Sequence, residues 1–79
     1  MLHLSSGVRL DGDDEIVFRQ VDLEEAGGDG LYAADLEEST GLSAQQVRQA
    51  LANLVDSEVL VATTTDDQLG ARYVKGRAV

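Results

Sequence analysis

The segment from residue 42 to 55 constrains the fold most strongly, because its start and its apolar spacing both specify a helix. Ser43 and Gln46 match the Ser-x-x-Gln capping box, in which each side chain accepts a hydrogen bond from the other residue's backbone N–H group. Leu42, directly before the cap, is placed to pack on Val47 as a hydrophobic staple. Apolar residues then recur at helical spacing: Val47, Ala50, Leu51, Leu54 and Val55. The segment predicts an amphipathic helix with one buried stripe.

Two further helices are predicted earlier in the chain. The first begins at Asp13, where three consecutive acids favour the positive end of the helix dipole, and ends at Gly27-Gly28. Its apolar residues are Ile16, Val17, Phe18, Val21 and Leu23. The second spans residues 33–39, with Leu36 directed inward and Asp35 in its first turn. Gly41 then lets the chain turn into the third helix.

Strands are expected on both sides of these helices. Leu2, Leu4, Val8 and Leu10 alternate in the first ten residues, so residues 1–12 are interpreted as an arm or a short edge strand. An alternative pairs residues 8–10 with residues 16–18 as a hairpin. Residues 59–64 are rich in β-branched side chains and predict a strand, residues 65–70 a polar turn, and residues 71–75 a returning strand.

Charge is distributed unevenly along the 79 residues, which are enough for one small domain. Residues 11–38 hold eleven acids and one base, whereas residues 39–79 hold four acids and four bases. The overall charge of −9 argues against a nucleic-acid partner, because each phosphate contact depends on Lys or Arg. The excess of acid lies in the first half, however, and the second half is nearly neutral.

Several classes of function are not supported by the residues present. Apolar runs of three or four residues are far shorter than the ~20 of a membrane helix, and no basic and apolar leader begins the chain, so we expect a cytoplasmic protein. His3 is the single histidine, cysteine is absent, and Asp11–Glu15 fits a helix start better than a calcium loop, so no metal site is predicted. No nucleophile has a base nearby, and we expect neither an enzyme nor a cofactor.

The residues from Gly30 to Ser43, followed by Val47, Leu51, Leu54 and a β-hairpin, resemble the winged helix-turn-helix domains of bacterial and archaeal transcriptional regulators. The resemblance covers residues 30–77. It implies an α+β, mostly helical fold with three helices and a C-terminal hairpin wing, in a domain spanning residues 13–77. It also implies a small regulator that binds double-stranded DNA, with the third helix in the major groove and the wing on the backbone.

The resemblance also assigns roles to individual residues. It places four side chains of the third helix at base edges: Gln45, Arg48, Gln49 and Asn53. It places three cations of the wing at phosphates: Arg72, Lys75 and Arg77. The chemistry is suitable, because Gln and Asn pair with adenine and Arg pairs with guanine. A homodimer is expected, since the binding free energies of two weakly charged half-sites would then add.

Three positions depart from the family pattern. Glu37 replaces a small residue between the helices, so its side chain must separate them or turn outward. Glu58 replaces the usual glycine after the third helix and is expected to adopt a left-handed conformation at a cost of ~1 kcal/mol. Asp66 and Asp67, at the tip of the wing, carry negative charges that repel a phosphate backbone.

The uneven charge supports alternative functions. One is an acidic winged-helix module that binds a basic protein through four carboxylates: Glu24, Glu25, Glu37 and Glu38. Another is a DNA mimic, whose negative surface occupies a nucleic-acid-binding protein. A salt-rich cytoplasm would also favour such a composition, since a single Lys stands against fifteen acids.

Overall fold

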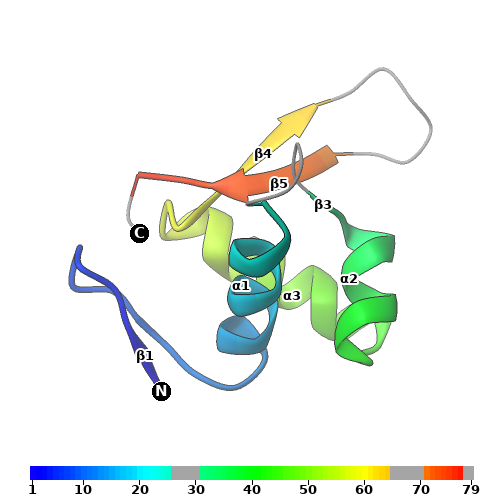
Figure 1. Ribbon diagram of the computed structural model, residues 1–79, viewed down its shortest axis with the longest axis horizontal. Helices are drawn as coiled ribbons and strands as arrows, with labels where there is room; N and C mark the ends of the chain where they lie inside the picture. The colour runs from blue at the N-terminus through cyan, green and yellow to red at the C-terminus, as the bar shows by residue number, and fades with distance from the viewer. Residues whose placement is uncertain (26–30, 65–70, 78–79) are drawn as a thin grey trace.

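The computed structural model describes residues 1–25, 31–64 and 71–77, and it combines three α-helices with short antiparallel strands (Figure 1). The elements follow in the order β1 (Leu2–His3), β2 (Arg9–Leu10), α1 (Gly12–Glu25), β3 (Leu31–Tyr32), α2 (Ala33–Thr40), α3 (Ala44–Asp56), β4 (Leu60–Thr64) and β5 (Ala71–Lys75). More of the described residues lie in helices than in strands. The prediction of an α+β, mostly helical fold is confirmed.

The last strands form a three-stranded sheet in the order β3-β5-β4, which Figure 1 shows on one side of the helices. β4 and β5 pair antiparallel from Leu60↔Lys75 to Thr64↔Ala71, as the sequence predicts. β3 pairs with the other edge of β5, where Leu31 lies opposite Tyr73. Two residues are too few to show an alternating pattern, so no local signal predicts β3.

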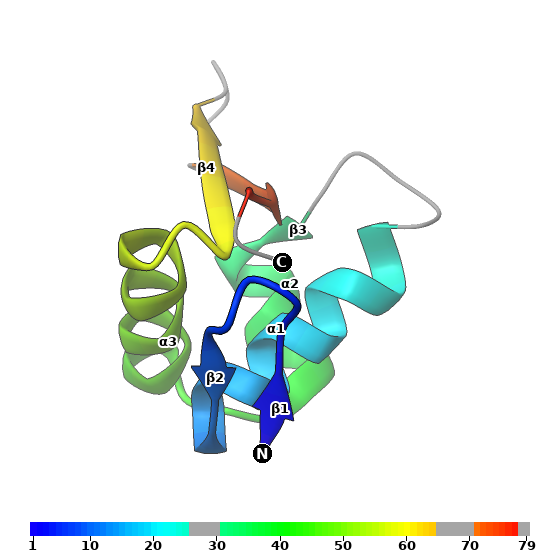
Figure 2. The same cartoon turned by 90° about the vertical axis from the view of Figure 1, so that its left-hand side faces the viewer.

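The N-terminal residues form a hairpin rather than an extended arm. β1 and β2 pair antiparallel with Leu2 opposite Leu10, and the backbone N–H of Leu4 donates to the Val8 carbonyl at 2.9 Å. Figure 2 shows this hairpin in front of α1. The alternative pairing with residues 16–18 is wrong, because those residues lie within α1. Leu10 is buried in the same core as the helices.

The core lies between the three helices and the start of β4. Its buried members come from β2, α1, α2, α3 and the β4 entry: Leu10, Val17, Phe18, Val21, Leu36, Val47, Ala50, Leu51, Leu54, Val59 and Leu60. α1 begins with the three predicted acids in its first turn. Two of its predicted apolar residues stay outside the core, since Ile16 is 44% exposed and Leu23 is 71% exposed.

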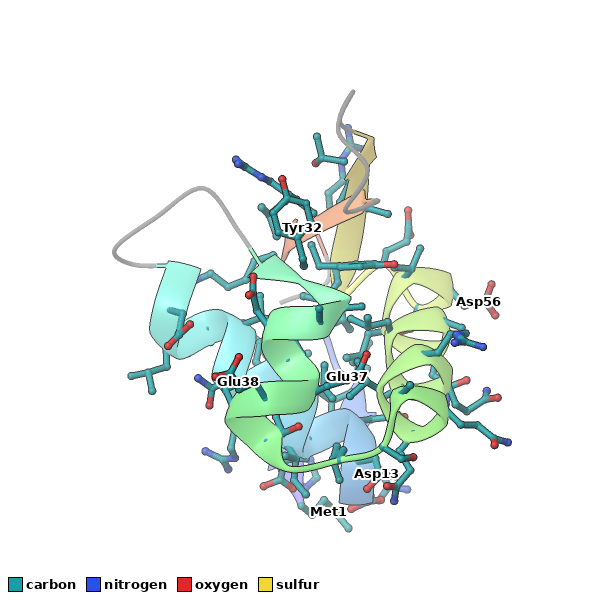
Figure 3. All side chains as sticks on the ribbon, turned by 90° about the vertical axis from the view of Figure 1, so that its right-hand side faces the viewer. Met1, Asp13, Tyr32, Glu37, Glu38 and Asp56 are labelled. Carbon is teal, nitrogen blue, oxygen red and sulfur yellow. The ribbon has the colours of Figure 1, made fainter. Side chains whose placement is uncertain are left out.

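The turn between α2 and α3 has the predicted geometry. Gly41 has a φ of 77°, a left-handed conformation, and its N–H donates to the Glu37 carbonyl at 3.1 Å. Leu36 is fully buried, as expected. The Glu37 side chain is half-buried, and Figure 3 places it at the boundary between α2 and α3.

The end of α3 confirms the predicted strain at Glu58, which has a φ of 64°. The N–H of Glu58 donates to the Val55 carbonyl at 3.0 Å, and the N–H of Val59 donates to the Leu54 carbonyl at 2.9 Å. These two bonds form a Schellman motif, which satisfies carbonyl groups at the end of the helix. Glu58 occupies the position in that motif where glycine is usual.

Some predicted features lie outside the described residues. These are the Gly27-Gly28 break, the turn at residues 65–70, and with it Asp66 and Asp67. Within residues 1–25, 31–64 and 71–77, no helix has the length and apolar character that crossing a bilayer requires.

Candidate nucleic-acid interface

The capping box predicted for α3 is present. Ser43 Oγ accepts from the Gln46 backbone N–H at 3.2 Å, and Gln46 Oε1 accepts from the Ser43 N–H at 2.9 Å. Gln46 Nε2 also donates to Asp13 Oδ2 of α1 at 3.5 Å. Both ends of the Gln46 amide are therefore held within the molecule, and α3 has a fixed start.

One side of α3 anchors it and the opposite side is exposed. Val47, Ala50, Leu51 and Leu54 are buried against the rest of the core. The exposed side lines a surface depression with five residues, which we call the α3 outer face: Ala44, Gln45, Arg48, Gln49 and Ala52. Three of the four predicted base-contacting side chains thus share one solvent-exposed surface.

The fourth predicted residue, Asn53, is directed elsewhere. Its Nδ2 atom donates to the Asp14 carboxylate of α1 at 3.4 and 3.5 Å, and its Oδ1 atom accepts from Gln49 Nε2 at 3.2 Å. Residues five apart on a helix point about 140° apart, so Asn53 and Arg48 lie on different flanks of α3. Asn53 is exposed but does not line the depression.

Charge is uneven around the α3 outer face. Arg48 is exposed and is the one charged residue among the five that line the depression. The Asn53 flank faces Asp13 and Asp14 of α1, which accept from Gln46 and Asn53. Figure 3 shows Asp13 near the start of α3 and Asp56 at its far end. The α3 outer face therefore has a cation on one side and carboxylates on the other.

The third acid of the α1 first turn is held by local cations. Glu15 accepts from the N-terminal ammonium of Met1 at 2.9 Å and from Arg19 Nε at 2.8 Å. The hydrogen bonds from this ammonium and from Arg19 hold the pKa of Glu15 below its usual range. The three acids at the start of α1 thus support the helix and its neighbours, as expected for a helix start. Within the described residues, no group of three or more His, Cys, Asp or Glu is arranged to hold a metal ion.

Two of the three predicted phosphate-binding cations have partners within the chain. Arg72 is half-buried, with Nε donating to the Tyr32 hydroxyl at 3.1 Å and Cζ lying 5.3 Å from the centre of the Tyr32 ring. Lys75 Nζ lies 2.9 Å from Asp22 Oδ1, in a pair whose side chains are 40% and 53% exposed. Arg77 is exposed. An exposed ion pair contributes only about 0–1 kcal/mol, so the pair between Lys75 and Asp22 adds little to stability.

The acidic residues predicted to bind a basic protein lie on two elements. Glu24 is exposed in the last turn of α1, while Glu38 is exposed and Glu37 is half-buried on α2. The Glu25 side chain lies outside the described residues.

Sequence reasoning missed the contacts from α1 to Gln46 and Asn53, because residues more than thirty positions apart carry no local pattern that pairs them.

Neither a protein-family model nor a curated protein matches the chain.

Proposed function

We propose that this chain is a winged helix-turn-helix protein that binds double-stranded DNA and regulates transcription. α3 enters the major groove, and the β4–β5 hairpin lies on the phosphate backbone. The observation that carries the proposal is the α3 outer face, where Gln45, Arg48 and Gln49 are exposed together on a helix anchored by its opposite side. A helix of this width with base-complementary side chains fits a major groove.

The order of elements supports the winged-helix assignment. A short strand, β3, lies between the first two helices and pairs with β5, so the hairpin that follows α3 is joined to the segment before α2. α2 and α3 meet at a tight left-handed turn at Gly41. This arrangement presents one helix outward beside a hairpin, which is the geometry that DNA-binding winged helices use.

Electrostatics predict weak binding by a single copy. Arg48, Arg72, Lys75 and Arg77 supply at most four phosphate or base contacts, for a salt slope of roughly −3 to −4 per copy. Two of these cations must first leave Tyr32 and Asp22. A homodimer that binds two half-sites compensates for this weakness, because the second contact becomes intramolecular.

The test is a titration of random-sequence duplexes at low salt, followed by fluorescence anisotropy on the selected site. We expect Arg48→Ala to cost ~1–3 kcal/mol and to relax specificity at one base pair. Arg19→Ala is the matched control, because it removes the same charge from α1, outside the α3 outer face. Failure of the wild-type chain to retain any duplex at low salt contradicts the proposal, and so does an equal loss in both variants.

A second candidate function is the binding of a basic protein. The positive surface is interrupted, and this favours the second candidate. Arg72 and Lys75 contact Tyr32 and Asp22 of the same chain, and Asp14 lies beside one flank of α3. Changing Glu24, Glu37 and Glu38 to Lys is expected to abolish capture of a basic partner, while the same changes are expected to strengthen DNA binding. The two candidates therefore predict opposite effects of one variant.

A further inference from the structure

We propose that Asn53 is a positioning residue rather than a base-contacting one. Together with Asp14 it fixes the amide of Gln49, so that Gln49 selects adenine over guanine. This inference rests on the proposed DNA-binding function and names the base that the α3 outer face recognises. It comes from three side chains that meet although Asp14 and Asn53 are 39 residues apart in the sequence.

The Asp14 carboxylate determines which way the hydrogen bonds of Asn53 and Gln49 run. An ionised carboxylate only accepts, so Asn53 must turn its amino group toward Asp14, at 3.4 and 3.5 Å. The carbonyl oxygen of Asn53 then faces the preceding turn of α3, where it accepts from Gln49 Nε2 at 3.2 Å. The charge of Asp14 thereby sets the orientation of both amides.

This orientation determines what Gln49 offers to a base. One of its two N–H donors is used by Asn53, which leaves one donor and the carbonyl oxygen as an acceptor. Adenine presents one acceptor and one donor in the major groove, whereas guanine presents two acceptors. The held amide matches adenine. A released glutamine, by contrast, is free to direct both N–H groups at guanine.

Gln45 provides a matched comparison on the same surface. It lies one turn before Gln49 on the α3 outer face and is exposed. Within the described residues its side chain has no hydrogen-bond partner, so nothing fixes the orientation of its amide. Only the preference for the base facing Gln49 should therefore depend on Asn53.

The first experiment observes the side-chain amides by ¹⁵N NMR without DNA. In Asn53→Ala and in Asp14→Ala, we expect the NH₂ resonances of Gln49 to move toward those of a free glutamine. The resonances of Gln45 should stay unchanged in both variants, and circular dichroism verifies that each variant is folded. Gln49 resonances that do not move in Asn53→Ala overturn the positioning role.

The second experiment measures base preference on the site selected by the wild-type chain. The base pair facing Gln49 is the one whose preference Gln49→Ala removes. There we expect adenine to be favoured over guanine about tenfold or more by the wild-type chain, and less than about threefold by Asn53→Ala. Preferences elsewhere, including the position lost in Gln45→Ala, should be unchanged.

The outcomes separate the two proposals. An undiminished adenine preference in Asn53→Ala, or a guanine preference in the wild-type chain, overturns the positioning role while DNA binding stands. If the wild-type chain binds no duplex, the proposed function fails and the adenine assignment fails with it. In that case the NMR experiment still decides whether Asp14 and Asn53 hold Gln49.

Discussion

The α3 outer face and strand β5 hold the two halves of the candidate interface, and they differ in how far their side chains are already engaged. Gln45 and Arg48 project into solvent from a helix whose other side is buried. On β5, by contrast, Arg72 rests on Tyr32 and Lys75 pairs with Asp22. In the proposed complex, the side chains that contact bases are already exposed, whereas the β5 cations that contact phosphate must exchange partners on binding.

The largest expected effect comes from removing the anchor of α3. Leu54 is fully buried, so Leu54→Ala should lower the free energy of unfolding by about 2–5 kcal/mol. Gln45→Ala, on the outer side of the same helix, should change it by less than about 0.5 kcal/mol. Urea denaturation measures both. Similar losses in the two variants would show that the outer face is itself part of the packed structure.

The next effect concerns the end of β5, where Gly76 packs against the junction between α3 and β4. A Cβ atom at Gly76 would overlap the carbonyl oxygen of Glu58 and press on Val61, and the Gly76 N–H donates to the Val59 carbonyl at 2.8 Å. Gly76→Ala should therefore destabilise the fold by about 1–3 kcal/mol. Thermal melting measures this change. A variant as stable as the wild-type chain would mean that β5 does not approach the α3–β4 junction so closely.

A smaller effect, of opposite sign, is expected at that junction. Glu58 has a left-handed φ of 64°, which favours glycine, and Glu58→Gly should raise the free energy of unfolding by about 1 kcal/mol. The change leaves both the α3 outer face and the β5 cations in place. Urea denaturation of Glu58→Gly beside Glu58→Ala isolates the backbone contribution. Equal stabilities for these two variants would contradict the left-handed assignment.

The smallest effect concerns the ion pair between Lys75 of β5 and Asp22 of α1. Asp22→Asn removes the carboxylate that pairs with Lys75, and stability should change by no more than about 0.5 kcal/mol because the pair is exposed. DNA affinity at low salt should rise, since Asp22 then no longer competes with phosphate for Lys75. Anisotropy titration measures the rise, and Glu38→Gln, at an exposed position on α2, is the control for charge alone. An equal rise in both variants would show that Lys75 is not restrained by its partner.

Local patterns explain which parts of this fold could be predicted. The capping box at Ser43, the turn at Gly41 and the strained Glu58 depend on neighbours within a few residues, and all three were predicted. The helix boundaries follow from the same signals. β3 could not be predicted, because its two residues gain their structure only by pairing with β5.

The candidate site was less predictable than the fold. Sequence identified the side chains with suitable chemistry, but it could not show which of them were engaged. The partner of Asn53 lies 39 residues away on α1, and that of Arg72 lies 40 residues away at Tyr32. Such contacts depend on how the elements pack, and no spacing in the sequence encodes them.

In the proposed complex, the uncovered side of α3 meets the DNA duplex. The most direct test follows backbone amide chemical shifts of the ¹⁵N-labelled chain during titration with selected duplex DNA at low salt. We predict that the largest changes fall on residues 44–53, with smaller ones on residues 71–77. Changes confined to Glu24, Glu37 and Glu38, or the absence of any change, would show that the uncovered side of α3 does not bind the duplex.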